Sequence, residues 1–342
     1  MGMNRGINKQ HGMAAIMVTM ILAVVITIIV IGFAQVVRRE QRNALDDQLS
    51  TQAYYAAESG VNLAQQKIKE KLASPSPALT EKNDCGASAE YNIAASDYTI
   101  GQEAEITCLM ISSRLSSLEY QKVDMHSVPM YIKSAVGAID KIYISWQASN
   151  GSTAVTAGCA TSNGFASSWS CPQPLLRLDL VPVAGATDPT SVAGRQYTTF
   201  LYPTTGGGTA SYSAGSKDTV ASAKCQTATG PLNPKVCTIA ISGLGQQAYA
   251  ARLMSVYGDS DLSVFALDAT GARQTLIEGQ VLIDTTAKAS DVLKRVQARM
   301  SLTTPVPDFG ITAAGGGVCK RYKKVGSNIS IEAGSPAFCN IP

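Results

Sequence analysis

The sequence predicts an α+β protein with a long N-terminal helix, half transmembrane and half amphipathic, followed by a mainly antiparallel β-sandwich head with disulfides. Three observations predict this class. Residues 13–37 carry no charged side chain. A stripe of apolar and small residues with helical spacing then continues to about residue 73. From about residue 90, short β-branched runs alternate with turn residues, and eight cysteines are spread along this part of the chain.

The uncharged run fixes how the chain is anchored. As a helix, its 25 residues would reach roughly 37 Å, which exceeds the ~30 Å hydrocarbon core of a bilayer. A cleaved secretory signal has an apolar core of only about 7–15 residues, so that class is excluded. Two readings remain. The run is either an uncleaved signal anchor, or the start of a mature protein whose leader is cut after Gly12.

The helix is predicted to continue beyond the membrane. Between Arg38 and Ala73 there is no proline, and Gly60 is the only glycine. Pro75 and Pro77 then end the helix, because proline disfavours the helical conformation of the residue before it. The apolar and small residues that recur at i, i+3 or i+4 spacing are Leu45, Leu49, Ala53, Ala56, Gly60, Ala64, Ile68 and Leu72. This pattern predicts one helix of about 60 residues that leaves the membrane and presents one apolar face.

The N-terminal region resembles the type IV pilins, and most closely their minor-pilin branch. The resemblance covers about residues 9–72. It is carried by the basic leader ending in Gly12, the uncharged run, and the segment Gln52–Gly60 with its Ala-Ala-Glu-Ser-Gly signature. It implies cleavage between Gly12 and Met13 by a prepilin peptidase and assembly with other pilin subunits. The residues expected to serve helix assembly are Met17, Leu45, Leu49, Ala53, Ala56 and Gly60.

Met17 departs from the pattern of the abundant pilins. Subunits that build the fibre shaft usually carry glutamate as the fifth mature residue, and the family resemblance implies that it neutralises a neighbour's terminal amine. A carboxylate within a bilayer is costly and usually functional, so its replacement by methionine matters. Met17 favours a low-copy minor pilin over a shaft subunit. The alternative is a lineage whose fibre packs differently.

The cysteines indicate the compartment of the head. Arg5 and Lys9 precede the apolar run while Arg38, Arg39 and Arg42 follow it, so charge alone does not orient the helix. All eight cysteines follow it, and an even number beyond an export segment predicts disulfides in an oxidising space. We therefore expect the cytoplasmic (inner) membrane with an extracytoplasmic head, followed by the cell surface or pilus.

Eight cysteines can pair in 105 different ways, and the sequence does not decide among them. Sequential pairing is the simplest, and it would join Cys85 to Cys108, Cys159 to Cys171, Cys225 to Cys237 and Cys319 to Cys339. Each bridge would be worth about 2–4 kcal/mol. Zinc is the rival explanation for the cysteines. It is not expected, because no C-x2-C occurs and His126 is the sole histidine after the helix.

The head is predicted from short runs rich in β-branched and aromatic residues, bounded by turns. These runs are 105–112, 141–147, 175–183, 197–202, 236–242, 249–257, 262–267 and 275–285. No helical pattern recurs between them, which favours an antiparallel sandwich. The expected divisions are a leader (1–12), a transmembrane half-helix (13–37), an amphipathic half-helix (38–73), a linker (74–89), the head (90–304) and a disulfide-clamped tail (305–342).

Motifs of catalysis are weak in this sequence, and no enzyme, cofactor or metal is expected. Residues 243–248 fit G-x-G-x-x-A, but a dinucleotide site also needs a helix directly afterwards, and a strand is predicted there. Residues 211–215 miss the G-x-S-x-G pattern by one position. Asp259, Asp261 and Asp268 are oxygen ligands of the kind that calcium takes, although such residues more often end hairpins.

The sequence also bears on what the surface of the head binds. Charged residues make up only 15% of the chain and the formal charge is +3, so nucleic-acid binding is not expected. Trp169 lies in a serine-rich loop between Cys159 and Cys171, where an exposed aromatic ring would serve as a surface-binding anchor. Trp146 alternates with polar residues as a core side chain does.

The function predicted from these features is that of a minor pilin or pilin-like subunit of a type IV pilus. It would assemble through its N-terminal helix and present an extracellular head for adhesion, to a host cell or other surface, or for subunit contacts. Two alternatives remain. One is a membrane-anchored extracellular carbohydrate- or surface-binding module with an uncleaved anchor. The other is a pseudopilin of type II secretion.

Overall fold

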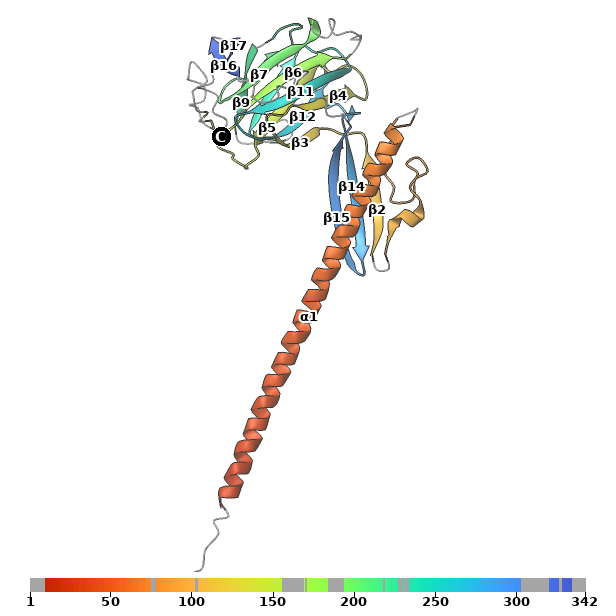
Figure 1. Ribbon diagram of the computed structural model, residues 1–342, viewed down its shortest axis with the longest axis vertical. Coiled ribbons are helices and arrows are strands. Elements are labelled where there is room, and N and C mark those ends of the chain that lie inside the picture. The colour runs from red at the N-terminus through yellow and green to blue at the C-terminus, as the bar shows by residue number, and fades with distance from the viewer. Residues whose placement is uncertain are drawn as a thin grey trace, which may run out of the picture. The chain divides into compact units, whose positions relative to one another are not determined.

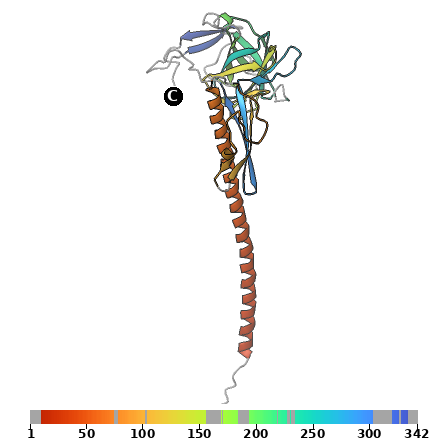
Figure 2. The same cartoon turned by 90° about the vertical axis from the view of Figure 1, so that its right-hand side faces the viewer.

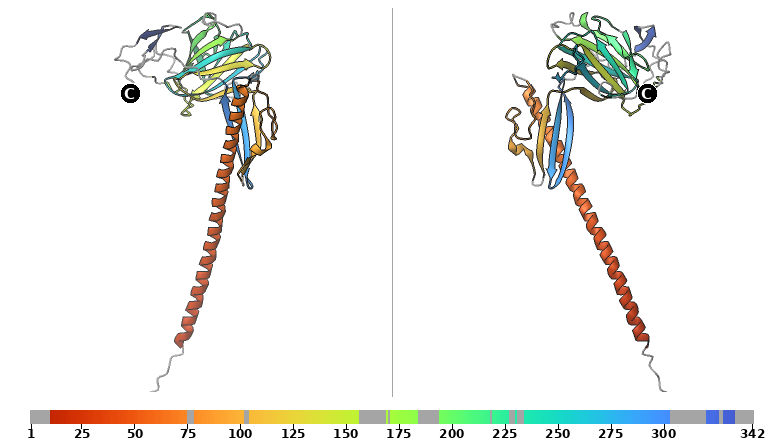
Figure 3. Two further views of the ribbon diagram at one scale, coloured as in Figure 1. Left: turned by 45° about the vertical axis from the view of Figure 1, so that its right-hand side comes forward. Right: turned by 180° about the vertical axis from the view of Figure 1, so that it is seen from behind.

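The computed structural model describes residues 10–74, 78–101, 104–155, 169, 171–183, 194–217, 219–226, 230, 234–302, 320–325 and 328–333. Helix α1 spans Gln10–Leu72 without a break (Figure 1). It is one continuous rod in every view (Figures 2 and 3). The predicted long helix is therefore confirmed, and it ends just before the two prolines, as expected.

The chain folds into two compact units. The first contains α1 up to Leu63 together with residues 85–109 and 285–296. The second contains residues 64–84, 110–284 and 297–342. The sequence had given no sign that two separate segments of the predicted head would pack with the helix.

A four-stranded sheet accompanies the helix. Its strands are β1 (Thr99–Ile100), β2 (Ala104–Ser112), β14 (Gln280–Ala289) and β15 (Val292–Ser301), in the order β1-β2-β14-β15. The short helix η1 (Ala95–Tyr98) leads into it. Strands β2 and β14 are neighbours in space, yet strands β3 to β13 lie between them in sequence. The large sheet of the second unit is therefore inserted within the small one.

Small residues let the helix approach this sheet closely. Strands β2, β14 and β15 run beside the upper part of α1 (Figure 1). Ala56 and Ala57 form a buried cluster with Ala287 of β14. A Cβ on Gly60 would lie inside van der Waals contact of the Thr285 methyl group and 3.1 Å from Ile106 Cδ1. Ala56 and Gly60 of the predicted stripe thus lie on the contact face between α1 and its own sheet.

The second unit is built on one large sheet with the order β13-β4-β11-β6-β7-β9-β10-β5-β12-β3. Its strands are β3 (Leu118–Val123), β4 (Val128–Ser134), β5 (Lys141–Ala148), β6 (Leu175–Pro182), β7 (Tyr197–Thr204), β8 (Thr209–Ser211), β9 (Thr219–Cys225), β10 (Cys237–Ser242), β11 (Ala248–Val256), β12 (Ser260–Leu267) and β13 (Leu276–Ile277). Most pairings are antiparallel; β7–β9 and β8–β10 are parallel. The α+β class and the mostly antiparallel head are confirmed.

The end strands of the large sheet, β13 and β3, are connected through Leu115. Leu276 of β13 pairs with Leu115, which lies three residues before β3 begins at the other end of the sheet. Leu115 N–H donates to Leu276 O at 2.9 Å, and Leu276 N–H donates back at 2.7 Å. A sandwich would have two separate sheets. Here strands β3 to β13 instead form one continuous hydrogen-bonded sheet.

One predicted strand is in fact two. The run 275–285 divides into β13 and β14, which belong to different sheets. The break is at Glu278, whose φ of 63° is rare for a residue with a side chain, and at Gly279. A Cβ at Gly279 would meet the Tyr131 carbonyl oxygen, so glycine allows the two strands to separate here.

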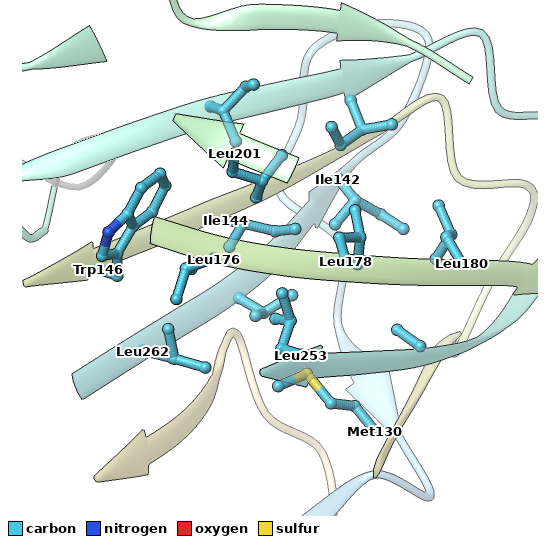
Figure 4. Close-up of a cluster of buried hydrophobic side chains, with 14 of the residues drawn as sticks. Met130, Ile142, Ile144, Trp146, Leu176, Leu178, Leu180, Leu201, Leu253 and Leu262 are labelled. Carbon is cyan, nitrogen blue, oxygen red and sulfur yellow. The ribbon is translucent and has the colours of Figure 1, made fainter. Parts of the chain in front are cut away.

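The core of the second unit is apolar and tightly enclosed. Trp146 is fully buried and gathers with leucine and isoleucine side chains from β5, β6, β11 and β12 (Figure 4). Its indole Nε1–H donates to Pro174 O at 2.9 Å, which satisfies its polar atom. The interpretation of Trp146 as a core residue is confirmed.

Among the described residues, the structure shows two of the sequentially paired disulfides. Cys85 is bonded to Cys108 in the first unit, and Cys225 to Cys237 in the second. Cys171 is also disulfide-bonded. Cys159, Cys319 and Cys339 lie outside the described residues. Within the predicted tail, β16 (Lys320–Val325) pairs with β17 (Asn328–Ala333), and Asn328 pairs with Thr219 of β9.

Tyr120 makes the second unit sensitive to alkali. Burial raises the pKa of its phenol to about 12. An unfolded tyrosine loses its proton near pH 10, so the folded state binds more protons between pH 10 and 12 and its stability falls as pH rises. We expect Tyr120→Phe to remove about 1.4 kcal/mol of this alkaline loss at pH 11, halfway between the two pKa values. Urea unfolding of both proteins at pH 8 and pH 11 measures the difference, and parallel losses would contradict the expectation.

Candidate functional site: the assembly helix

The membrane half of α1 contacts nothing else in the described chain. Its large apolar side chains are exposed, from Ile16 at 69% to Val37 at 50%. By length and composition this helix is apolar enough to cross a membrane. Exposing so many large apolar side chains to water is unfavourable, so this surface needs lipid or the helices of other subunits around it.

The predicted assembly residues fall into two groups. Ala53, Ala56 and Gly60 are buried against the strands of their own unit. Met17 is 66% exposed and Leu45 is 54% exposed, while Leu49 is half-buried. The small-residue stripe therefore holds the helix on its sheet, and the surface that remains for a second subunit is the apolar half-helix and Leu45.

A hollow of about 590 Å³ lies beside Leu45 in the first unit. One wall comes from Leu45 and Leu49 of α1. The other residues that line it are Thr99, Gly101, Ala104, Glu105, Lys288 and Ser290. The aromatic rings of Tyr54 and Tyr55 are also exposed on this part of the helix, at 48% and 60%. The part of α1 after residue 37 thus exposes apolar and aromatic side chains as well as charged ones.

The disulfide Cys85–Cys108 ties the chain that enters this unit to strand β2. Between the two cysteines, Tyr91 and Ile93 are buried, and Tyr98 Oη donates to Gly86 O at 2.7 Å. Asp97 accepts a hydrogen bond from the Ala94 N–H at 2.9 Å. These contacts make the 85–109 segment a fixed part of the unit that surrounds the helix.

The other residues named from the sequence lie elsewhere. Gly12 and Met13 are in the first turn of α1. Trp169 is half-buried in the second unit, and its Nε1–H donates to Gln173 O at 3.2 Å. Tyr197 and Tyr202 of β7 are buried, with 4% and 7% of each residue exposed.

The motifs considered for chemistry take ordinary structural roles. The G-x-G-x-x-A segment joins β10 directly to β11, so a strand follows it and not the helix that a dinucleotide site requires. Asp268 accepts hydrogen bonds from Thr270 Oγ1 and Ala272 N–H within its own turn, and these hold the pKa of its carboxyl below the usual value. Among the described residues, no three metal-ligating side chains converge.

The comparison with known protein families gives a match, and it lies within helix α1. Residues 11–62 match a family model described as PilX N-terminal. The match covers only part of the N-terminal helix, less than half of the chain. The resemblance to the minor-pilin branch of the type IV pilins is thereby confirmed, and it supports a minor-pilin-type role with other pilus subunits as partners. No curated protein and no solved structure matches the chain.

The PilX N-terminal match extends from His11 to just past Gly60. It includes the whole membrane-anchoring half of the helix and the small-residue stripe that packs on the four-stranded sheet. The inserted large sheet lies outside it. The family therefore accounts for how this chain is anchored and leaves the purpose of its second unit to be argued from that unit's own residues.

Proposed function

We propose that this protein is a minor pilin of a type IV pilus, cut between Gly12 and Met13, which assembles through α1 and presents its inserted domain for surface or subunit contacts. The observation that carries the proposal is the exposed, uncharged half-helix in a segment that matches the PilX N-terminal family. This surface is stable only among lipid tails or other apolar helices.

The two units support a division of roles. The first unit gathers the helix, the disulfide Cys85–Cys108 and the four-stranded sheet, which together form a support for assembly. The large sheet enters after β2 and leaves into β14, so both of its connections are at neighbouring strands. An insertion of this kind can carry a separate binding function without altering the assembly helix.

Met17 bears on the position in a fibre. Its side chain is exposed and uncharged, so it offers no carboxylate to a neighbour's terminal amine. We propose that the subunit is incorporated at low copy number, where such a pairing is not required. The exposed Leu45, Tyr54 and Tyr55 would make the first contacts beyond the membrane.

The mass of the native protein tests the proposal. We expect the mature chain to start at Met13 and to lack residues 1–12, because a prepilin peptidase cuts after the last leader glycine. Gly12→Val should retain the leader, whereas Gly6→Val, a glycine within the leader, should be processed normally. Intact-mass measurement distinguishes the forms. A native chain that keeps Arg5 and Lys9 would refute the pilin role, and co-purification with secretion-system instead of pilus proteins would favour a pseudopilin.

A further inference from the structure

The second unit has a surface depression of about 470 Å³ that the assembly role does not use. It is lined by four segments far apart in sequence: Lys122, residues 148–150, the prolines that follow Cys171, and residues 257–259. Its volume falls within the range of small-molecule sites, which is about 300–1,000 Å³.

The buried amide of Gln173 joins two of these segments. Gln173 is only 2% exposed. Its Oε1 accepts the Ala148 N–H at 2.9 Å, and its Nε2 donates to Ser152 O at 2.9 Å and to Ala154 O at 3.1 Å. All of these bonds fix the 171–174 segment against the 148–154 segment. The disulfide at Cys171 and the fixed φ of Pro172 and Pro174 hold the same wall.

Asp261 joins Lys122 to the 148–150 segment. Its Oδ1 accepts the Lys122 N–H at 2.9 Å and the Ser149 hydroxyl at 2.7 Å. The Ser149 N–H donates in turn to Asp259 O at 3.0 Å, and Ser255 Oγ donates to Gly258 O at 2.6 Å. The depression is therefore formed before any ligand arrives, which lowers the entropic cost of binding.

Two lining residues have strained backbones. Lys122 has a φ of 54° and Tyr257 a φ of 70°, a conformation that is a genuine outlier for a bulky side chain. This conformation costs about 1–3 kcal/mol per residue, and it also occurs outside the depression, at Asn92, Glu278 and Ser290. Lys122 lies where the register of the β3–β12 pairing shifts, and Tyr257 lies in the turn from β11 to β12, so both positions are set by the backbone of the sheet.

The lining combines an aromatic platform with balanced polar groups. The ring of Tyr257 is 42% exposed and stacks on Trp169, with ring centroids 4.8 Å apart and an angle of 12° between planes. Around it are one cation, Lys122, one anion, Asp259, and the amide of Asn150, whose Oδ1 accepts the Ser152 N–H. Trp169 thus supports the platform, and Tyr257 presents it.

We propose that this depression binds a neutral saccharide. The C–H face of a sugar ring would lie on Tyr257, and its hydroxyl groups would bond to Asp259, Asn150 and Lys122. A phosphate or an ammonium ligand is disfavoured, because the cation and the anion of the lining cancel. The proposal rests on the proposed function only for the placement of the head outside the cell, and the site itself is tested separately.

The fluorescence of Trp169 reports binding. The chain has two tryptophans, and Trp146 is fully buried in the core. The full-length protein is placed in a polyoxyethylene detergent, since a maltoside would itself present sugar. It is screened against an array of neutral oligosaccharides that includes lactose, cellobiose and chitobiose, and the best ligand is then titrated. We expect saturable quenching with at least one of them.

Variants decide whether this depression is the site. Tyr257→Gly keeps the positive φ and removes the platform, and it should weaken binding by about tenfold or more. Asp259→Asn, an exposed change with no packing role, should also weaken binding and serves if Tyr257→Gly unfolds. Tyr131→Thr, a tyrosine outside the depression, should bind normally. The inference would be overturned by no saccharide binding, by site variants that bind as tightly as the wild type, or by displacement of the sugar by a polyproline peptide. Normal leader removal in that case would leave the pilin role intact.

Discussion

Trp146→Ala is expected to destabilise the second unit by about 3–5 kcal/mol. Trp146 is fully buried among side chains from several strands of the large sheet, so its removal leaves a cavity that the surrounding strands cannot close. Its loss also leaves Pro174 O without the indole donor. A stable domain has only about 5–15 kcal/mol in total, so part of the population would unfold at growth temperature.

Urea unfolding followed by Trp169 fluorescence measures this effect. Trp146→Phe is the matched variant, because it keeps most of the volume and loses only the hydrogen bond, and about 1–3 kcal/mol is expected. If the free energy of unfolding of Trp146→Ala were less than about 1 kcal/mol below that of the wild type, the core would have collapsed around the cavity, contrary to the expectation. Since Pro174 lines the proposed saccharide site, Trp146→Phe should also weaken ligand binding.

Gly60→Leu is expected to separate α1 from its sheet and to reduce incorporation into pili. A Cβ at this position already meets the Thr285 methyl group, and Ile106 Cδ1 is 3.1 Å away, so a leucine has no room. Overpacking of this kind costs about 1–3 kcal/mol. The first unit would then hold the assembly helix less firmly.

Amide hydrogen exchange of residues 53–63 provides the measurement, together with the amount of the subunit in sheared pili. Gly32→Leu is the control, because this second glycine of the same helix has nothing within 4 Å of a Cβ. Exchange in residues 53–63 should rise in Gly60→Leu and stay unchanged in Gly32→Leu. Equal exchange in the two variants would show that the helix does not depend on this close approach.

Much of the secondary structure followed from local patterns. The bounds of α1 were predictable because the apolar stripe, the missing prolines and the terminating Pro75 and Pro77 act within a few residues of one another. Each of the eight predicted runs contains a strand, since alternation and turn residues are also local signals. The Cys225–Cys237 pairing follows from its short loop, which the adjacent strands β9 and β10 close.

The candidate site was only partly predictable. Met17 and Leu45 were named from the sequence and are exposed, as an assembly contact requires. Tyr257 and Gln173 were not named, because a single tyrosine at a strand end and a single glutamine carry no pattern. Their roles depend on Trp169 and Ala148, which lie 88 and 25 residues away.

The sequence by itself determined the long apolar helix and the alternation of strands and turns in the head. Only the tertiary structure decided that β2 and β14 are neighbours, that the stripe at Gly60 serves the chain's own sheet, and that four remote segments enclose one depression. The physical reason is that periodicity records which face of an element is apolar. It does not record which surface covers that face, because that choice is made by contacts between residues far apart in the chain.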